Sequence, residues 1–345
     1  MMIKRHRITV ALLAVVTVSV GWTYYADSPA EQISEAAQTF LTALDDEQKA
    51  KAVMPYDAEQ RVDWHFIPKK ERKGAIYSGM NGKQKKAAMA LMASTLSKIG
   101  YEKTTTIMAL EGVLHELEKA NPGKFARDPE KYYFTVFGDP AGDSKWGLSI
   151  EGHHLSLNFV LEGDDVVSST PTVLCANPTV VSSDTAGIKK GTRVLKDEEV
   201  LAFELVNSLD DDQKKTAIFA EEAPREVRNA GEAQPPVADP VGIAYKALSR
   251  EQQQTLEDLV DTYAYTVQLQ VGRDRIREIV EADPEKIYFG WAGALKPGIG
   301  HYYRIQGPTF LIEFVNTQPD AAGNPASHIH AIWRDVRGDF AISIK

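Results

Sequence analysis

The pattern of hydrophobic and polar positions divides this chain into two blocks with the same order of elements. In each block, apolar residues first recur at helical spacing and then form the alternating or continuous runs typical of strands. Helices are predicted at 30–52, around 88–99, and at 104–120, 198–220, 250–265 and 274–282. Strands are predicted at 131–137, 147–161, 166–174, 286–291, 302–315 and 329–336. This arrangement predicts an α+β fold.

The two blocks also resemble each other residue by residue. Residues 128–159 align on 283–314 without a gap and give ten identities in 32 positions, where composition alone gives roughly two. The sequence therefore predicts an internal duplication into two helix-then-antiparallel-strand halves related by a pseudo-twofold axis. The first half is 30–176, the second is 194–345, and residues 177–193 link them.

The two copies match at framework positions and differ at polar ones. Gly152 aligns with Gly307 and Phe159 with Phe314, whereas Trp146 aligns with His301, His154 with Thr309 and Asn158 with Glu313. Similar halves with different polar sets indicate one composite site between them.

The first 29 residues have a separate character. Lys4, Arg5 and Arg7 precede an apolar run at 8–22, which is typical of an export signal and short for a bilayer span. An uncleaved N-terminal anchor is the alternative. We therefore expect a periplasmic or secreted protein that contacts a membrane only through such an anchor.

Net charge and cysteine content restrict the classes of molecule that this protein is expected to bind. A net charge of −9 and a pI near 5.5 argue against a nucleic-acid partner. The single cysteine, Cys175, cannot form an internal disulfide and is expected to be a buried apolar residue. The expected partner is a small-molecule or polymer substrate that the sequence does not identify.

Histidines are concentrated in the predicted strands, where residues two apart share a face. His328 and His330 then lie together with Arg334, at a spacing that lets two imidazoles bind one metal ion. His154 and Glu313 lie on the polar faces of their strands, and His301 is in phase with Glu313 if the strand is unbroken at Gly307. We predict that the histidines bind a divalent metal (zinc, copper or iron): His154, His301, His328 and His330.

Three further residues are predicted to act in catalysis. Glu313 is expected to be a ligand or the base that takes a proton from metal-bound water, and Arg334 to stabilise negative charge. His65 follows Trp64 in an irregular segment that only the first half contains, so it is a candidate substrate-facing residue. The alternative for this segment is a structural one, with Trp64 covering the core.

Three classes of function remain open. The first is a metal-dependent enzyme, with hydrolysis by metal-bound water favoured over copper or iron oxidation on the same ligands. The second is a non-catalytic metal- or ligand-binding protein, and the third a metal-free enzyme that uses histidine and arginine. The motifs of serine hydrolases, P-loop proteins and dinucleotide-binding proteins do not occur in the sequence.

Several motifs resemble those of a known family. They are Trp64-His65-Phe66-Ile67-Pro68, Arg72-Lys73-Gly74, Gly152-His153-His154-Leu155, His328-Ile329-His330 and Trp333-Arg334-Asp335. Together they resemble domain-of-unknown-function family 3500 over nearly the whole mature chain. The resemblance implies an exported bacterial protein and supports these site residues, but it implies no particular reaction.

Overall fold

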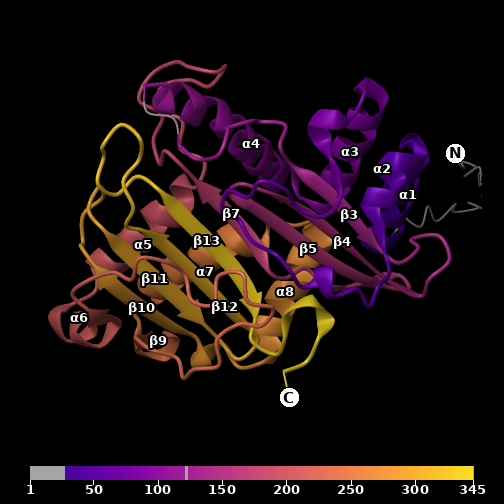
Figure 1. Ribbon diagram of the computed structural model, residues 1–345. Helices are drawn as coiled ribbons and strands as arrows, with labels where there is room; N and C mark the ends of the chain where they lie inside the picture. Colours follow the sequence, from indigo (N-terminus) through magenta and orange to yellow (C-terminus); the bar gives the residue numbers. More distant parts are fainter. Residues whose placement is uncertain (1–27, 121–122, 345) are drawn as a thin grey trace, which may run out of the picture.

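A large mixed β-sheet with helices packed on one face organises the molecule (Figure 1). The computed structural model describes residues 28–120 and 123–344. The main strands of the sheet are β3 (Tyr133–Phe137), β4 (Lys145–Gly152), β5 (Leu155–Glu162), β7 (Thr172–Ala176), β10 (Tyr288–Gly293), β11 (His301–Gln306), β12 (Phe310–Asn316) and β13 (Ile329–Asp335). The α+β class predicted from the sequence is confirmed.

The strand order places the first-half strands beside the second-half strands. The central order is β3-β4-β5-β7-β13-β12-β11-β10, and all neighbours in it are antiparallel. The short strands are β1 (Val53–Met54), β2 (Ala75–Ile76), β6 (Asp165–Ser168), β8 (Ile218–Ala220) and β9 (Ile243–Ala244). The two sets of strands join at the pairing of β7 with β13, where Cys175 lies opposite His330.

Most helices begin at a residue whose side chain caps the first turn. The helices are α1 (Pro29–Ala43), α2 (Asp46–Ala52), α3 (Gly82–Thr95), α4 (Lys98–Glu118), α5 (Lys196–Ser208), α6 (Asp211–Ala217), α7 (Arg250–Ala264) and α8 (Leu269–Glu281). Each of the predicted helices at 30–52 and 198–220 is in fact two, because Asp45 and Asp210 form capping boxes that start new helices. Short 3₁₀ turns occupy Glu59–Arg61, Tyr77–Gly79, Tyr245–Ala247, Pro284–Lys286 and Asp339–Ala341.

The two faces of the sheet are covered differently. The larger apolar cluster joins helical residues such as Phe40 and Leu259 to strand residues such as Ile150 and Phe314. A smaller cluster on the other face contains Trp64, Phe66, Val173, Cys175, Ile332 and Phe340, and among the described residues it takes no member from an α-helix. This second face, which we call the coil face, is covered by irregular segments around 62–66, 220–230 and 340.

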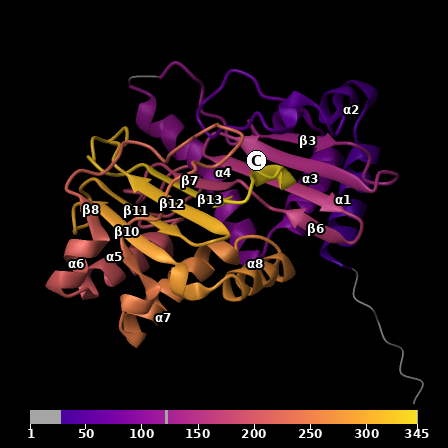
Figure 2. The same cartoon turned by 90° about the horizontal axis from the view of Figure 1, so that it is seen from below.

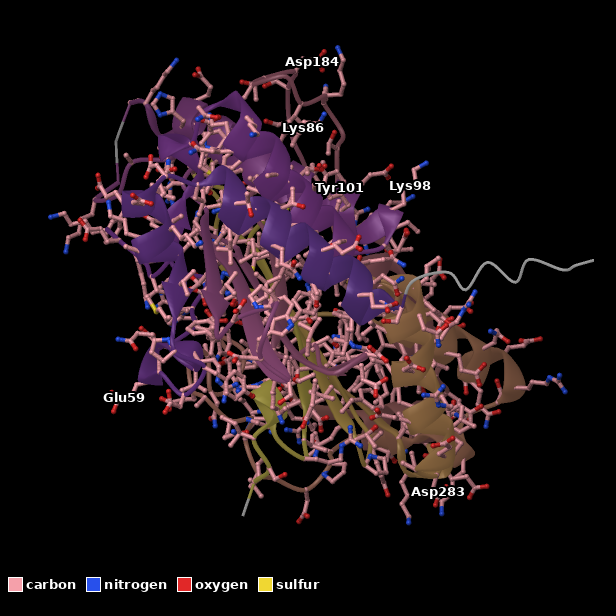
Figure 3. The ribbon with its side chains drawn as sticks, turned by 90° about the vertical axis from the view of Figure 1, so that its right-hand side faces the viewer. Glu59, Lys86, Lys98, Tyr101, Asp184 and Asp283 are labelled. Atoms are coloured by element: carbon pink, nitrogen blue, oxygen red, sulfur yellow. The ribbon has the colours of Figure 1, made fainter. Side chains whose placement is uncertain are left out.

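The views agree with this division into layers. Seen from below, α5, α6 and α7 lie to one side of the second-half strands (Figure 2). In the side view, Lys98 and Asp283 both lie at the outer edge of the molecule (Figure 3). Within the described residues, no helix has the length and apolar character needed to span a bilayer. The basic residues and the apolar run of the predicted export segment lie outside these residues.

Candidate metal centre

A tight turn between β4 and β5 positions His154. Its φ of 65° lies in the left-handed region that non-glycine residues rarely adopt. Two backbone hydrogen bonds hold this geometry: His154 N donates to Phe66 O at 2.8 Å, and Cys175 N donates to His154 O at 2.9 Å. The turn is thereby tied both to the coil face and to β7, where the halves meet.

His328 and His330 approach the same point from the start of β13. Strand alternation places His330, Ile332 and Arg334 on the coil face, while Ile329 and Trp333 join the helix-side core. The backbone N–H of His328 donates to Asn316 Oδ1 at 2.9 Å, which fixes the residue just before the strand begins.

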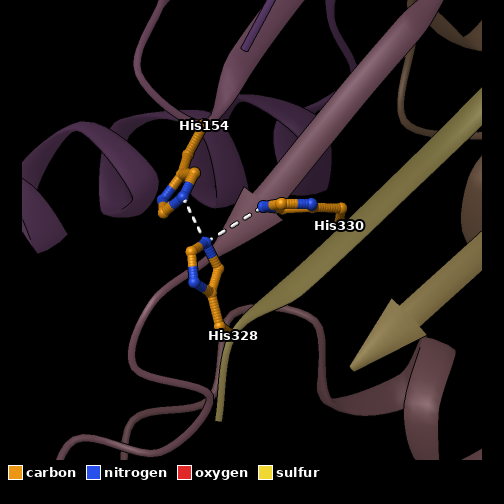
Figure 4. Close-up of side chains that lie close together, drawn as sticks. All are labelled: His154, His328 and His330. Atoms are coloured by element: carbon orange, nitrogen blue, oxygen red, sulfur yellow. Dashed lines mark hydrogen bonds between the residues drawn. The ribbon is translucent and has the colours of Figure 1, made fainter. Parts of the chain in front are cut away.

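The three imidazoles converge through their Nε2 atoms (Figure 4). His328 Nε2 lies 2.8 Å from His154 Nε2 and 3.0 Å from His330 Nε2. A tetrahedral zinc ion bound at about 2.0–2.1 Å would separate two nitrogens by about 3.3 Å. A small outward movement of each ring would therefore accommodate the ion, and His154, His328 and His330 form a group that could hold a metal.

The hydrogen-bond partners show which nitrogens are free. Nδ1 of His330 faces both oxygens of Glu226 at 2.8 Å. A carboxylate only accepts hydrogen bonds, so Nδ1 carries the proton and Nε2 presents a lone pair. Nδ1 of His328 lies 3.3 Å from the amide of Asn177, whose buried Oδ1 has no partner. Rotation of that amide would let Oδ1 accept from Nδ1 of His328 and would leave the Nε2 lone pair of His328 for a metal.

Burial favours the neutral form of His154 and His328. It lowers the pKa of His154 well below its usual value, with His153 and His328 adding to the effect. Burial and the neighbouring His330 lower the pKa of His328 to about 2. Neutral imidazole is the form that coordinates a metal. Without a cation, a proton on Nε2 of His328 would face the Nε2 atoms of both His154 and His330 and could be donated well to only one of them.

A second histidine–carboxylate pair lies against the first group. Nδ1 of His153 contacts Glu111 Oε1 at 2.5 Å, and the His153 ring stacks on His154 with a centroid distance of 3.6 Å. Arg127 Nη1 also approaches His153 Nδ1, at 3.2 Å. His153 and Glu111 were not among the predicted metal-binding or catalytic residues.

His301 does not join the cluster. Its ring lies on the helix side, stacked on Trp291 at a centroid distance of 5.7 Å, and its Nδ1 lies 2.8 Å from Ile299 O. Its Nε2 contacts Glu199 Oε1 at 3.2 Å without hydrogen-bond geometry. The prediction assumed a strand unbroken at Gly307, but β11 ends at Gln306 and pairs His301 with Asn316. His301 and Glu313 therefore face opposite sides of the sheet.

Glu313 and Arg334 are on the coil face, as predicted, but they bind other groups. Glu313 Oε1 accepts from Tyr302 Oη at 2.5 Å and from Arg228 Nε at 2.9 Å. Arg334 is completely buried, and its Nε donates to Asp339 Oδ2 at 2.6 Å. Its other nitrogens donate to the carbonyl oxygens of residues 229 and 232, so Arg334 fastens the covering segment to the sheet.

His65 lies beside the cluster without entering it. Its Nδ1 accepts from the backbone N–H of Phe66 at 3.0 Å, and the ring of Phe66 lies 4.7 Å from that of His330. Burial lowers the pKa of His65 to about 4, with smaller contributions from Lys69 and Arg72. His65 is therefore a neutral neighbour of the site.

Glu226 and Asn177 are the partners that sequence reasoning missed. Both lie in segments without periodic structure, so no pattern of polar positions singles them out. Cys175 lies opposite His330 across the strand pair, but its sulfur is outside the three-histidine group, and burial raises the pKa of its thiol. The expectation of a buried apolar cysteine agrees with this position.

Comparison with known proteins gives a family and no reaction. No curated protein and no solved structure matches this chain. The model of the family described as "Protein of unknown function (DUF3500)" matches residues 26–342, which is nearly the whole chain. The chain therefore belongs to the DUF3500 family.

Proposed function

We propose that the protein is a metal-dependent hydrolase in which His154, His328 and His330 bind one divalent ion. The observation that carries this proposal is the convergence of three Nε2 atoms from two distant parts of the chain. Three protein nitrogens leave a coordination position for water, the arrangement found in catalytic zinc sites. A metal bound there would supply an activated water molecule.

The surroundings support a resident metal rather than a structural histidine cluster. Glu226 holds His330 through Nδ1, as outer carboxylates commonly do for metal-bound histidines. The site also lies where the first and second halves of the sheet pair, which agrees with the composite site expected from the sequence. The same nitrogen set would also accept copper or iron, so the metal has to be identified by experiment.

The test combines metal analysis with matched histidine variants. The full chain would be purified without added metal, analysed for bound elements, stripped with a chelator and titrated with Zn²⁺. We expect one ion per chain in the parent and in His115→Ala, because His115 is an exposed residue on α4. His328→Ala should lose the ion while it remains folded.

Activity is tested on the same samples with a panel of ester, amide and phosphoester substrates. Hydrolysis by the parent should disappear on chelation and return with one equivalent of the native metal. A parent that binds metal but hydrolyses nothing would support a non-catalytic binding protein. Failure of the parent to bind any metal would exclude the metal-dependent proposal.

We also propose that the two halves arose by duplication and are related by a pseudo-twofold axis. The strand order reads the same from both ends, with β3 and β10 as counterparts and β7 and β13 at the centre. Matched glutamine pairs support this proposal: Gln48 and Gln84 exchange side-chain hydrogen bonds, as do Gln213 and Gln252. Superposition of 30–176 on 194–342 in an experimental structure should bring Gly152 onto Gly307. Placement of these glycines in non-equivalent turns would contradict duplication.

Export remains part of the proposal. The basic residues and apolar run at the N-terminus motivate it. Cell fractionation with N-terminal sequencing should find the protein outside the cytoplasm, either processed near residues 27–31 or still anchored. A cytoplasmic product with an intact N-terminus would contradict it.

A further inference from the structure

A cleft rich in positive charge lies beside the candidate metal centre. Its walls come from the segment around 68–72, from 125–133, and from Glu111 and His153. Its lining contains four cationic residues, Lys69, Arg72, Arg127 and Lys131, and two carboxylates, Glu111 and Asp128. Because the chain has a net charge of −9, this local excess of positive charge is unusual and marks the cleft as a candidate site for an anion.

Much of this charge is not neutralised by the protein. The guanidinium of Arg72 donates to the backbone oxygens of His65 at 2.6 Å and Gly152 at 3.1 Å, which are uncharged acceptors. Lys131 has no ion-pair partner among the residues that the structure describes, and Lys69 reaches only Asp63, at 3.5 Å. Arg127 differs, because Glu118 binds it through two hydrogen bonds of 2.9 Å.

His153 connects the cleft with the metal ligands. It forms part of the wall of the cleft, and its ring stacks on that of His154 at a centroid distance of 3.6 Å. Arg72 connects the same region to the histidine turn, because it binds the oxygen of Gly152, two residues before His154. An anionic group in the cleft would therefore lie next to the metal centre.

We propose that this cleft is the subsite for an oxyanion of the substrate, a carboxylate or phosphate group held by Lys69, Arg72 and Lys131. Arg72 is held in place by the backbone, so it offers fixed positive charge, and the two lysines add mobile donors. The substrate class is thus a small anionic molecule. This assignment rests on the proposed function in that it takes the bound oxyanion to be part of a substrate.

Inorganic phosphate is the probe for this proposal. Calorimetric titration at low ionic strength would be made on the metal-free full chain, on the Zn²⁺-loaded chain, and on Lys69→Gln/Lys131→Gln. The matched control is Lys190→Gln/Lys246→Gln, which removes the same charge from exposed lysines outside the cleft. We expect saturable binding by the parent and the control, and at least about tenfold weaker binding by the cleft variant.

The outcomes separate this proposal from the metal proposal. Phosphate binding by His328→Ala should match the parent, and the zinc content of the lysine variants should be unchanged. If the parent binds phosphate as expected but binds no metal, the hydrolase proposal is refuted while the assignment of an oxyanion-binding cleft is kept. Absence of saturable binding, or equal weakening in the control variant, would overturn the cleft assignment and leave the cations a structural role.

Discussion

Replacement of Glu226 by glutamine tests whether the carboxylate that binds Nδ1 of His330 increases the affinity of the site for metal. Both carboxylate oxygens lie 2.8 Å from Nδ1 of His330. Glutamine keeps the size of the side chain and an oxygen that can accept from Nδ1, but it removes the negative charge. His330 would then be a weaker donor to the metal, while its orientation would be largely kept.

The expected loss follows from the exposure of the carboxylate. Loss of an outer-shell partner commonly weakens metal binding by about 10- to 100-fold. The Glu226 side chain is 34% exposed, so solvent screens part of its charge. We therefore expect Glu226→Gln to weaken zinc binding by the low end of this range, about tenfold or roughly 1.4 kcal/mol. Glu226→Ala should lose more, because Nδ1 then has no acceptor.

Competition with a chromogenic zinc chelator at neutral pH would measure the change. Glu222→Gln is the matched control, because Glu222 is an exposed carboxylate in the same segment. Equal zinc affinity in the parent, Glu226→Gln and Glu226→Ala would refute the reasoning. Equal loss in Glu222→Gln would show that only the general charge of the segment matters.

Two other predictions concern stability. Arg334→Gln leaves the buried Asp339 without its ion-pair partner, so urea denaturation should show a loss of about 3–5 kcal/mol, while folded protein keeps its zinc content; an unchanged midpoint would argue against the fastening role. Burial depresses the pKa of His154 and brings that of His328 to about 2, so below about pH 6.5 the unfolded chain takes up protons that the folded chain does not. The free energy of unfolding of metal-free protein should therefore fall between about pH 6.5 and pH 5, and a flat profile in denaturant titrations would contradict this.

Strand alternation correctly predicted which side chains of the last strand share a face. In β13 the two-residue period correctly placed His330 and Arg334 on the face opposite Ile329 and Trp333. His154 was predicted to lie on the polar face of a strand, but it lies in a left-handed turn between β4 and β5, so strand parity does not determine its position. Family membership was also correctly recognised from the motifs.

The misplaced residues show where a one-dimensional pattern fails. The prediction placed His301 and Glu313 on one face by continuing the two-residue alternation through Gly307. The strand ends at Gln306, however, and a new alternation begins in β12. The prediction placed Glu313 and Arg334 on the correct face of the sheet. It did not predict their hydrogen-bond partners, which are set by the segments that pack against that face. Two of those partners, Arg228 and Asp339, come from a loop and a short 3₁₀ turn whose packing no local period encodes.

Because His154 and His328 are 174 residues apart, the three nitrogens come together only when β7 and β13 have paired. An ion bound there would act as a removable cross-link between the halves and stabilise only the assembled chain. Metal binding would then require the folded chain, and a nascent or partly translocated chain whose C-terminal half has not yet emerged would present only His154 of the three ligands. A chelator should lower the unfolding temperature of the whole chain rather than loosen one half.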